Sequence, residues 1–153
     1  MICWDKCRRD FEPDGALRDI YVNGTSIEHW RTLFDVLRST YELKYSVDGT
    51  MQPLPGSVDE VLTTRAIANP ELLFRVGDIV VACHFFTTTE IEFDISPCEV
   101  TSQAALDALL GFLRLVGDSL GRTVIMSYEN DEQHPFLCYE PSRREFQYHD
   151  VAG

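Results

Sequence analysis

The sequence predicts one α+β domain, built on a mainly antiparallel, twisted sheet that is packed by two main helices and one short helix. Residues 72–95 have the pattern of a central three-stranded meander, and a second group of β-type residues forms a C-terminal hairpin. Two long segments, 26–39 and 102–120, instead repeat apolar residues at helical spacing. A chain of 153 residues, of which 44% are hydrophobic, can bury a core as a single unit. We therefore expect one domain over residues 1–153.

The N-terminal part of the chain predicts a lead-in segment followed by a strand. Residues 1–15 form this lead-in segment, which ends in a turn at Glu-Pro-Asp-Gly. Residues 17–22 then read as the first strand, with Ile20 and Val22 facing inward.

The first main helix, 26–39, is predicted from a capping box. Thr25 takes the N-cap position in this interpretation, and Glu28 follows three residues later. Residues 41–47 alternate between apolar and polar side chains, which predicts a second strand. The strands on either side of the helix could be parallel, joined by a right-handed crossover, or could lie in an antiparallel split arrangement.

The two remaining helices are also predicted from their ends. Residues 50–56 contain two prolines and are expected to form a loop, after which a second capping box at Ser57 opens a short helix over 58–66. The long helix 102–120 carries a continuous apolar stripe and ends at Gly121, a residue that readily adopts the left-handed conformation of a helix end. We expect this helix to lie across the apolar face of the sheet.

The strand register of the meander follows from its alternation. Gly-Asp at 77–78 predicts a tight turn between the first two strands, and residues 87–89 form a three-residue loop before the third. In the third strand, carboxylates occupy one face and apolar residues the other. A three-residue loop matches the apolar faces of the two strands, whereas a two-residue loop would place charges against the core. The expected cross-strand pairs are Phe86 with Glu90, His84 with Glu92 and Ala82 with Asp94.

The C-terminal third predicts three more strands. Residues 122–128 read as a strand, and 129–135 read as an acidic loop. Residues 136–140 and 145–149 then form a hairpin in which the two flanking glutamates, at 140 and 145, are paired. Residues 150–153 are expected to fray.

The charge of the chain narrows the classes of partner. Lys and Arg total 13 against 25 Asp and Glu, a formal net charge of −12. Such a surface repels phosphates and anionic membranes, so we expect neither nucleic acid nor membrane as a partner. The same field attracts a basic protein.

The cysteines and the N-terminus indicate a cytoplasmic protein. Five cysteines are scattered along the chain, and the first residues carry charges where a signal peptide needs an apolar run. Cys3 and Cys7 lack the spacing of a zinc or redox motif and are interpreted as ordinary thiols in a mobile or surface segment. No apolar run reaches membrane-spanning length.

One polar cluster stands out as a candidate site. His84 is expected to lie among Glu90, Glu92 and Asp94 on the polar face of the meander. Such a cluster could bind a divalent metal, hold an imidazolium of raised pKa or face a basic partner; it could equally be the solvated face of a sheet. The acidic loop supplies a second patch whose distance from the first is open: Glu129, Asp131 and Glu132.

These features favour a binding protein over an enzyme. The sequence contains no nucleophile elbow, phosphate-binding loop or zinc-protease motif, and Cys83 and His84 point to opposite faces of a strand, so we expect no catalytic activity, cofactor or metal. In size, acidity and class the chain resembles small single-domain bacterial α+β proteins, among them the immunity proteins that neutralise polymorphic toxins. That resemblance implies an inhibitor that occludes a basic toxin or enzyme. Two alternatives remain: a small metal-dependent or hydrolytic enzyme built around His84 and Glu92, and a structural or regulatory subunit that acts through dimerisation.

Overall fold

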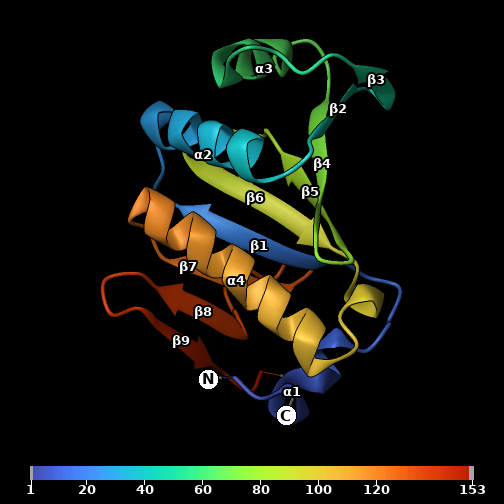
Figure 1. The fold of residues 1–153 in the computed structure, drawn as a ribbon, viewed down its shortest axis with the longest axis vertical. Helices are drawn as coiled ribbons and strands as arrows, with labels where there is room; N and C mark the ends of the chain where they lie inside the picture. The colour runs from blue at the N-terminus through green and yellow to red at the C-terminus, as the bar shows by residue number, and fades with distance from the viewer. Residues whose placement is uncertain (1, 152–153) are drawn as a thin grey trace.

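A computed structural model describes residues 2–151 as an α+β fold around one nine-stranded antiparallel sheet (Figure 1). The strands follow the spatial order β3-β2-β4-β5-β6-β1-β7-β8-β9, and the sheet is open. The strand bounds are β1 (Arg18–Asn23), β2 (Lys44–Val47), β3 (Thr50–Gln52), β4 (Pro70–Val76), β5 (Ile79–His84), β6 (Glu90–Ile95), β7 (Val124–Tyr128), β8 (Leu137–Glu140) and β9 (Glu145–Tyr148).

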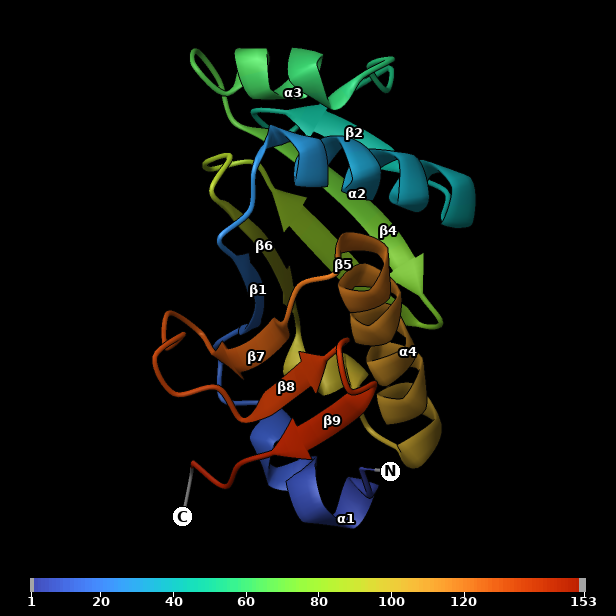
Figure 2. The same ribbon diagram turned by 90° about the vertical axis from the view of Figure 1, so that its left-hand side faces the viewer.

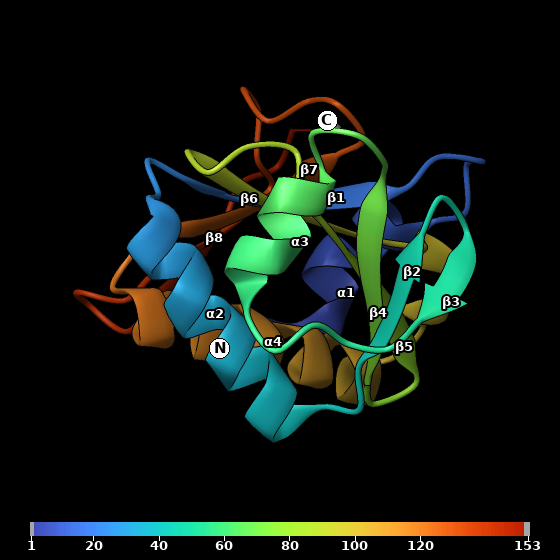
Figure 3. The ribbon, with the colours of Figure 1, turned by 90° about the horizontal axis from the view of Figure 1, so that it is seen from above.

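Within residues 2–151, the helices leave one face of the sheet uncovered (Figure 2). Figure 2 shows α2 and α4 on the same side of the sheet, while the loop between β7 and β8 projects on the other side. Seen from above in Figure 3, α3 lies beside α2 at one end of the molecule. The helices are α1 (Trp4–Cys7), α2 (Ile27–Thr40), α3 (Val58–Thr64) and α4 (Gln103–Leu120), with 3-10 turns at Arg8–Phe11 and Pro97–Glu99.

The core fills the space between α2, α4 and the sheet. Alternate residues of each central strand point toward the helices, which is the period-two pattern that the sequence predicts. On β6 these residues are almost completely buried, and Phe93 packs edge-on against Phe112 of α4. The apolar stripe of α4 therefore covers the apolar face of the sheet, as expected.

The meander has the predicted register. His84 lies opposite Glu92, and Ala82 lies opposite Asp94. The third expected pair, Phe86 with Glu90, is not part of the ladder because β5 ends at His84. The C-terminal hairpin also pairs Glu140 with Glu145, as the alternation of its side chains predicts.

The first two strands run in the same direction but are not neighbours. β1 lies between β6 and β7, whereas β2 pairs with β4. Three strands, β4, β5 and β6, therefore separate them. The chain forms a split arrangement in which the meander occupies the space between the two ends of the β1-α2-β2 unit.

The capping box of α2 begins one residue later than predicted. The N-cap is Ser26, whose backbone N–H donates to Nδ1 of His29 at 3.1 Å. Thr25, the expected cap, instead donates its hydroxyl and its N–H to the carbonyls of Thr88 and Thr89. Because Thr25 bonds to the loop after β5, it does not cap the helix, and Ser26 is the N-cap instead.

Other local predictions need correction. Residues 50–52 form the edge strand β3 and not a loop, because Asp48 and Gly49 adopt positive φ angles and turn the chain back on β2. The short helix ends at Thr64, two residues before the expected end. The strand predicted over 122–128 begins at Val124.

The N-terminal lead-in is helical and packed. Cys7 at the end of α1 is completely buried, so its interpretation as a thiol in a mobile or surface segment is wrong. Burial raises the pKa of Cys7 to about 11. All five cysteines are free thiols. At the other terminus, Asp150 forms an ion pair with Arg9, while the last two residues of the predicted frayed tail lie outside the described part of the chain.

Candidate functional site: the acidic face of the sheet

The polar face of the meander continues across four strands. We call the following residues the acidic face, which lies on the side of the sheet opposite α2 and α4. β4 contributes Glu71, β5 contributes His84, and β1 contributes Asp19 beside the three carboxylates of β6. The ladder pairs Glu71 with His84, His84 with Glu92 and Asp94 with Asp19 on the same side of the sheet, and alternation along β6 adds Glu90 to that side. Members of the acidic face are Asp19, Glu71, His84, Glu90, Glu92, Asp94 and, from the loop after β7, Glu132.

His84 lies at the centre of this face and contacts two carboxylates. Its Nε2 is 2.5 Å from Oδ2 of Asp94, and its Nδ1 is 3.6 Å from Oε2 of Glu71. The side chain is 14% exposed. Burial opposes the charged ring, but the hydrogen bond and charge of Asp94, followed by Glu71 and Glu92, raise the pKa of His84 overall. His84 is thus the basic side chain of the acidic face, and its carboxylate neighbours favour its protonated form.

On this face, Glu92 is the carboxylate whose pKa is shifted furthest from its ordinary value. Burial is the first cause and the charge of Asp19 the second, and together with Glu90 and Asp94 they raise the pKa of Glu92 to about 7 although His84 opposes the shift. The charged form of this side chain is therefore disfavoured relative to that of an exposed glutamate. A nearby cation would favour its charged form.

Tyr21 lies on the same side of the sheet as Asp19, opposite Glu92, and sequence reasoning missed both residues. They are each 4% exposed although no helix covers them. Oδ2 of Asp19 accepts hydrogen bonds from the Tyr21 hydroxyl at 2.7 Å and from the Asn130 N–H at 2.8 Å. Their alternation with Ile20 and Val22 could have assigned them to the polar side of β1. That β1 borders β6 could not be read from the sequence.

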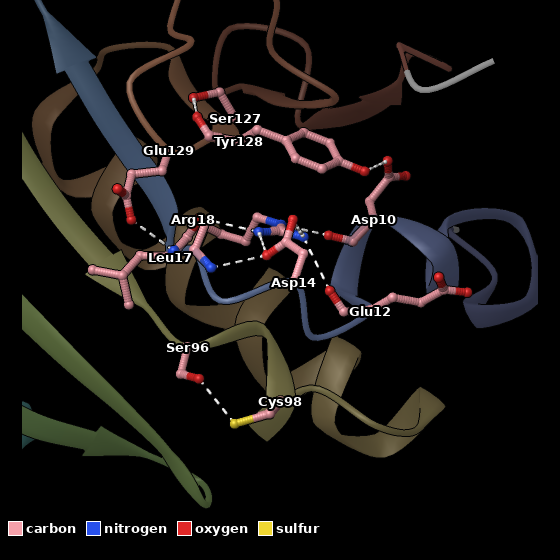
Figure 4. Close-up of polar contacts among 11 residues, drawn as sticks. Asp10, Glu12, Asp14, Leu17, Arg18, Ser96, Cys98, Ser127, Tyr128 and Glu129 are labelled. Atoms are coloured by element: carbon pink, nitrogen blue, oxygen red, sulfur yellow. Dashed lines mark hydrogen bonds and ion pairs between the residues drawn. The ribbon is translucent and has the colours of Figure 1, made fainter.

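Of the three residues predicted as a second acidic patch, one lies at the acidic face, and the other two make different contacts. The charge of Glu132 follows burial among the causes that raise the pKa of Glu90, which places this loop residue at the acidic face. Glu129 instead accepts a hydrogen bond from the Leu17 N–H at 2.7 Å, as Figure 4 shows. Asp131 contacts Nδ1 of His134 at 2.9 Å. Of the second predicted patch, the structure brings one residue to the first patch.

A buried arginine anchors β1 from its other side. Arg18 is 1% exposed, and its guanidinium donates to the carbonyls of Asp10 and Glu12 and to the carboxylate of Asp14 (Figure 4). The guanidinium also lies 4.3 Å from the centre of the Tyr128 ring. This cluster ties the N-terminal segment to the strand that carries Asp19.

An apolar rim borders the acidic face at the end of β5. Phe86 is 47% exposed, and its ring stacks on His84 with 5.1 Å between ring centres. The guanidinium of Arg65 lies 5.6 Å from the centre of the same ring. Ile67, two residues further along, is 89% exposed. Exposed apolar side chains beside a charged patch are typical of the centre of a protein interface.

A metal centre is not apparent in the part of the chain that the structure describes. Within residues 2–151, no group of three or more His, Cys, Asp or Glu side chains is arranged to hold a metal ion. No helix over the same residues is long and apolar enough to cross a membrane.

Comparison with protein-family models, with the curated proteins and with the solved structures finds no match to this chain. Its function is therefore inferred from its own geometry.

Proposed function

We propose that this protein is a cytoplasmic binding module that acts as an immunity-type inhibitor, and that it neutralises a basic toxin or enzyme by covering it with the acidic face. The observation that carries this proposal is the convergence of carboxylates from three strands and a loop around a single histidine on a face without helices. The formal net charge of −12 adds a long-range attraction for a basic partner.

Electrostatic repulsion among the carboxylates of the free protein also favours a basic partner. The raised pKa of Glu92, and that of Glu90, mean that burial and neighbouring carboxylates disfavour charge on this face. A partner lysine or arginine would relieve that repulsion and draw both groups toward the charged form. Binding at neutral pH should then release protons from the acidic face.

The apolar rim supplies the second component of an interface. Phe86 offers an exposed aromatic ring, held between His84 and Arg65, of the kind that dominates binding energy at interfaces. A partner that places an apolar side chain near Phe86 and Ile67 and basic side chains over Glu90 and Glu92 would match both parts of the surface.

The test compares three tagged proteins in affinity capture from the native cell lysate at low and moderate salt. The first is the wild type, and the second carries Glu90→Gln, Glu92→Gln and Glu132→Gln. The matched control carries the same change in charge at three exposed carboxylates elsewhere: Asp5→Asn, Glu60→Gln and Asp78→Asn.

We expect one basic protein to be retained by the wild type and the control, to be lost as salt rises and to be lost from the face variant. Equal retention by all three proteins would show that the acidic face is not the binding surface. A partner without toxic or enzymatic activity, or one whose activity the wild-type protein leaves unchanged, would contradict the inhibitor role.

A further inference from the structure

A cavity of about 520 Å³ lies where β2 leaves the sheet, away from the acidic face. Its volume is within the range of pockets that hold small organic ligands. Residues from the end of α2, from β2 and from the first two strands of the meander line it: Thr40, Tyr41, Glu42, Lys44, Leu73, Phe74, Arg75 and Val80.

The cavity exists because β4 is longer than its partner. β2 begins at Lys44, opposite Leu73, whereas β4 continues to Val76 in its pairing with β5. Beyond Leu73 the chain before β2 diverges toward α2 and leaves one side of β4 without a partner strand. In an antiparallel strand alternate residues turn both N–H and C=O to the same side, so at least one residue of 74–76 directs these groups toward the vacated side.

One wall of the cavity is apolar and rigid. Phe74 is 3% exposed, and its ring stacks on Tyr41 with 5.0 Å between centres. Phe112 of α4 supports Phe74 from within the core, 5.6 Å away. Leu73 and Val80 line the cavity from the other face of the sheet, because they alternate with Phe74 and its partner Val81. A flat apolar group could pack there without rearrangement of the fold.

Two cations line the cavity on the same face of the sheet as Leu73: Lys44 lies directly opposite Leu73, and Arg75 lies two residues further along β4. Lys44 and Arg75 are both exposed, and within residues 2–151 neither makes an ion pair. By contrast, Arg31 and Arg38 each contact a carboxylate of the protein. Glu42 is the carboxylate among the lining residues.

We propose that this cavity binds a small organic carboxylate with an apolar body. The carboxylate would be held by Lys44 and Arg75, and the apolar body would pack on Tyr41, Phe74 and Leu73. Glu42 would weaken the binding of an anion, because it adds a negative charge at the same cavity. The inference is independent of the proposed inhibitor function, since it uses other residues and another ligand.

The experiment measures binding of 3-phenylpropionate to the full chain by amide chemical shifts, with the uncharged 3-phenylpropionamide as the reference ligand. We expect saturable shifts at Tyr41, Phe74 and Arg75 with a Kd of roughly 1–5 mM for the carboxylate, as its size allows. The amide should bind at least about fivefold more weakly because it lacks the charge.

Three variants separate this site from a general charge effect. Lys44→Gln with Arg75→Gln should weaken binding about five- to tenfold, and Glu42→Gln should strengthen it about two- to threefold. The control, Arg143→Gln with Arg144→Gln, removes the same two positive charges at the turn between β8 and β9, at the other end of the sheet, and should leave the affinity unchanged. All of these side chains are exposed, so the fold should persist, and circular dichroism checks this.

The proposal is overturned if no saturable shift appears at these residues up to about 50 mM ligand, roughly tenfold above the upper end of the expected Kd range. Equal affinity for the amide, or equal weakening by the cavity variant and the control, would also overturn it.

Discussion

Asp19 and Asp94 lie directly opposite each other on β1 and β6. Like charges at opposed positions of an antiparallel pair are destabilising. Each carboxylate has its own compensation: Asp94 contacts His84, and Asp19 accepts hydrogen bonds from Tyr21 and from the N–H of Asn130. The acidic face therefore persists because local donors offset its repulsion, and changes to those donors should be measurable.

Replacing His84 by Gln should destabilise the protein in a pH-dependent way. The pKa of His84 is raised on folding, so its contribution to stability is present below the unfolded pKa and is lost as pH rises through the folded pKa. The loss should be about 1–3 kcal/mol near pH 6 and smaller near pH 9. Urea unfolding at both pH values measures it, with His134→Gln, an exposed histidine, as the control. Equal losses at both pH values would contradict a charged role for His84.

Replacing Glu92 by Gln should stabilise the protein at alkaline pH. Because folding raises the pKa of Glu92 to about 7, the unfolded chain loses this proton first, and wild-type stability falls as pH rises between the unfolded pKa and about 7. The gain should be about 1–2 kcal/mol near pH 8, after allowance for solvent screening, and near zero at about pH 4.

Thermal unfolding across that pH range measures the effect of Glu92→Gln. The exposed Glu60, changed to Gln, is the matched control and should leave the pH profile unaltered. If the pH profiles of the Glu92 and Glu60 variants coincide, ionisation of Glu92 does not destabilise the fold.

Removing the hydroxyl of Tyr21 should cost about 1–2 kcal/mol of the free energy of unfolding, because the buried Asp19 carboxylate loses a donor. The control is Tyr41→Phe, since the Tyr41 hydroxyl makes no hydrogen bond within residues 2–151. Chemical denaturation compares the two. A similar loss of unfolding free energy in both variants would mean that the Tyr21–Asp19 hydrogen bond does not contribute to stability.

The two glycines inside α4 should respond in opposite ways to alanine. A Cβ at Gly117 would lie 2.6 Å from a ring carbon of Tyr139, whereas a Cβ at Gly111 would meet nothing within 4 Å. Gly111→Ala should therefore stabilise the protein by about 0.5–1 kcal/mol through helix propensity. Gly117→Ala should destabilise it by about 1–3 kcal/mol, since the rigid ring must move. The melting temperatures of the two variants measure these effects. Stabilisation by both substitutions would contradict the close approach of Gly117 to the Tyr139 ring.

Much of the fold could be predicted because its determinants are local. The register of β5 and β6 follows from the alternation around His84 and Glu92, and Gly121 marks the end of α4 because its φ of 63° suits glycine. Two of the predictions failed because a distant segment intervened. Thr25 has the right chemistry for a cap but bonds to the loop after β5, and Cys7 is buried by packing of the N-terminal helix.

By itself the sequence determined the α+β class, the main helices, the pairing of β5 with β6 and of β8 with β9, and the acidic strand β6. Only the tertiary structure decided that β1 lies beside β6, which brings Asp19 opposite Asp94, and that Glu132 folds onto the same face while Glu129 does not. The physical reason is the range of the forces involved. Alternation and capping act between residues close in the chain, whereas the neighbour of β1 depends on how the whole apolar surface is buried.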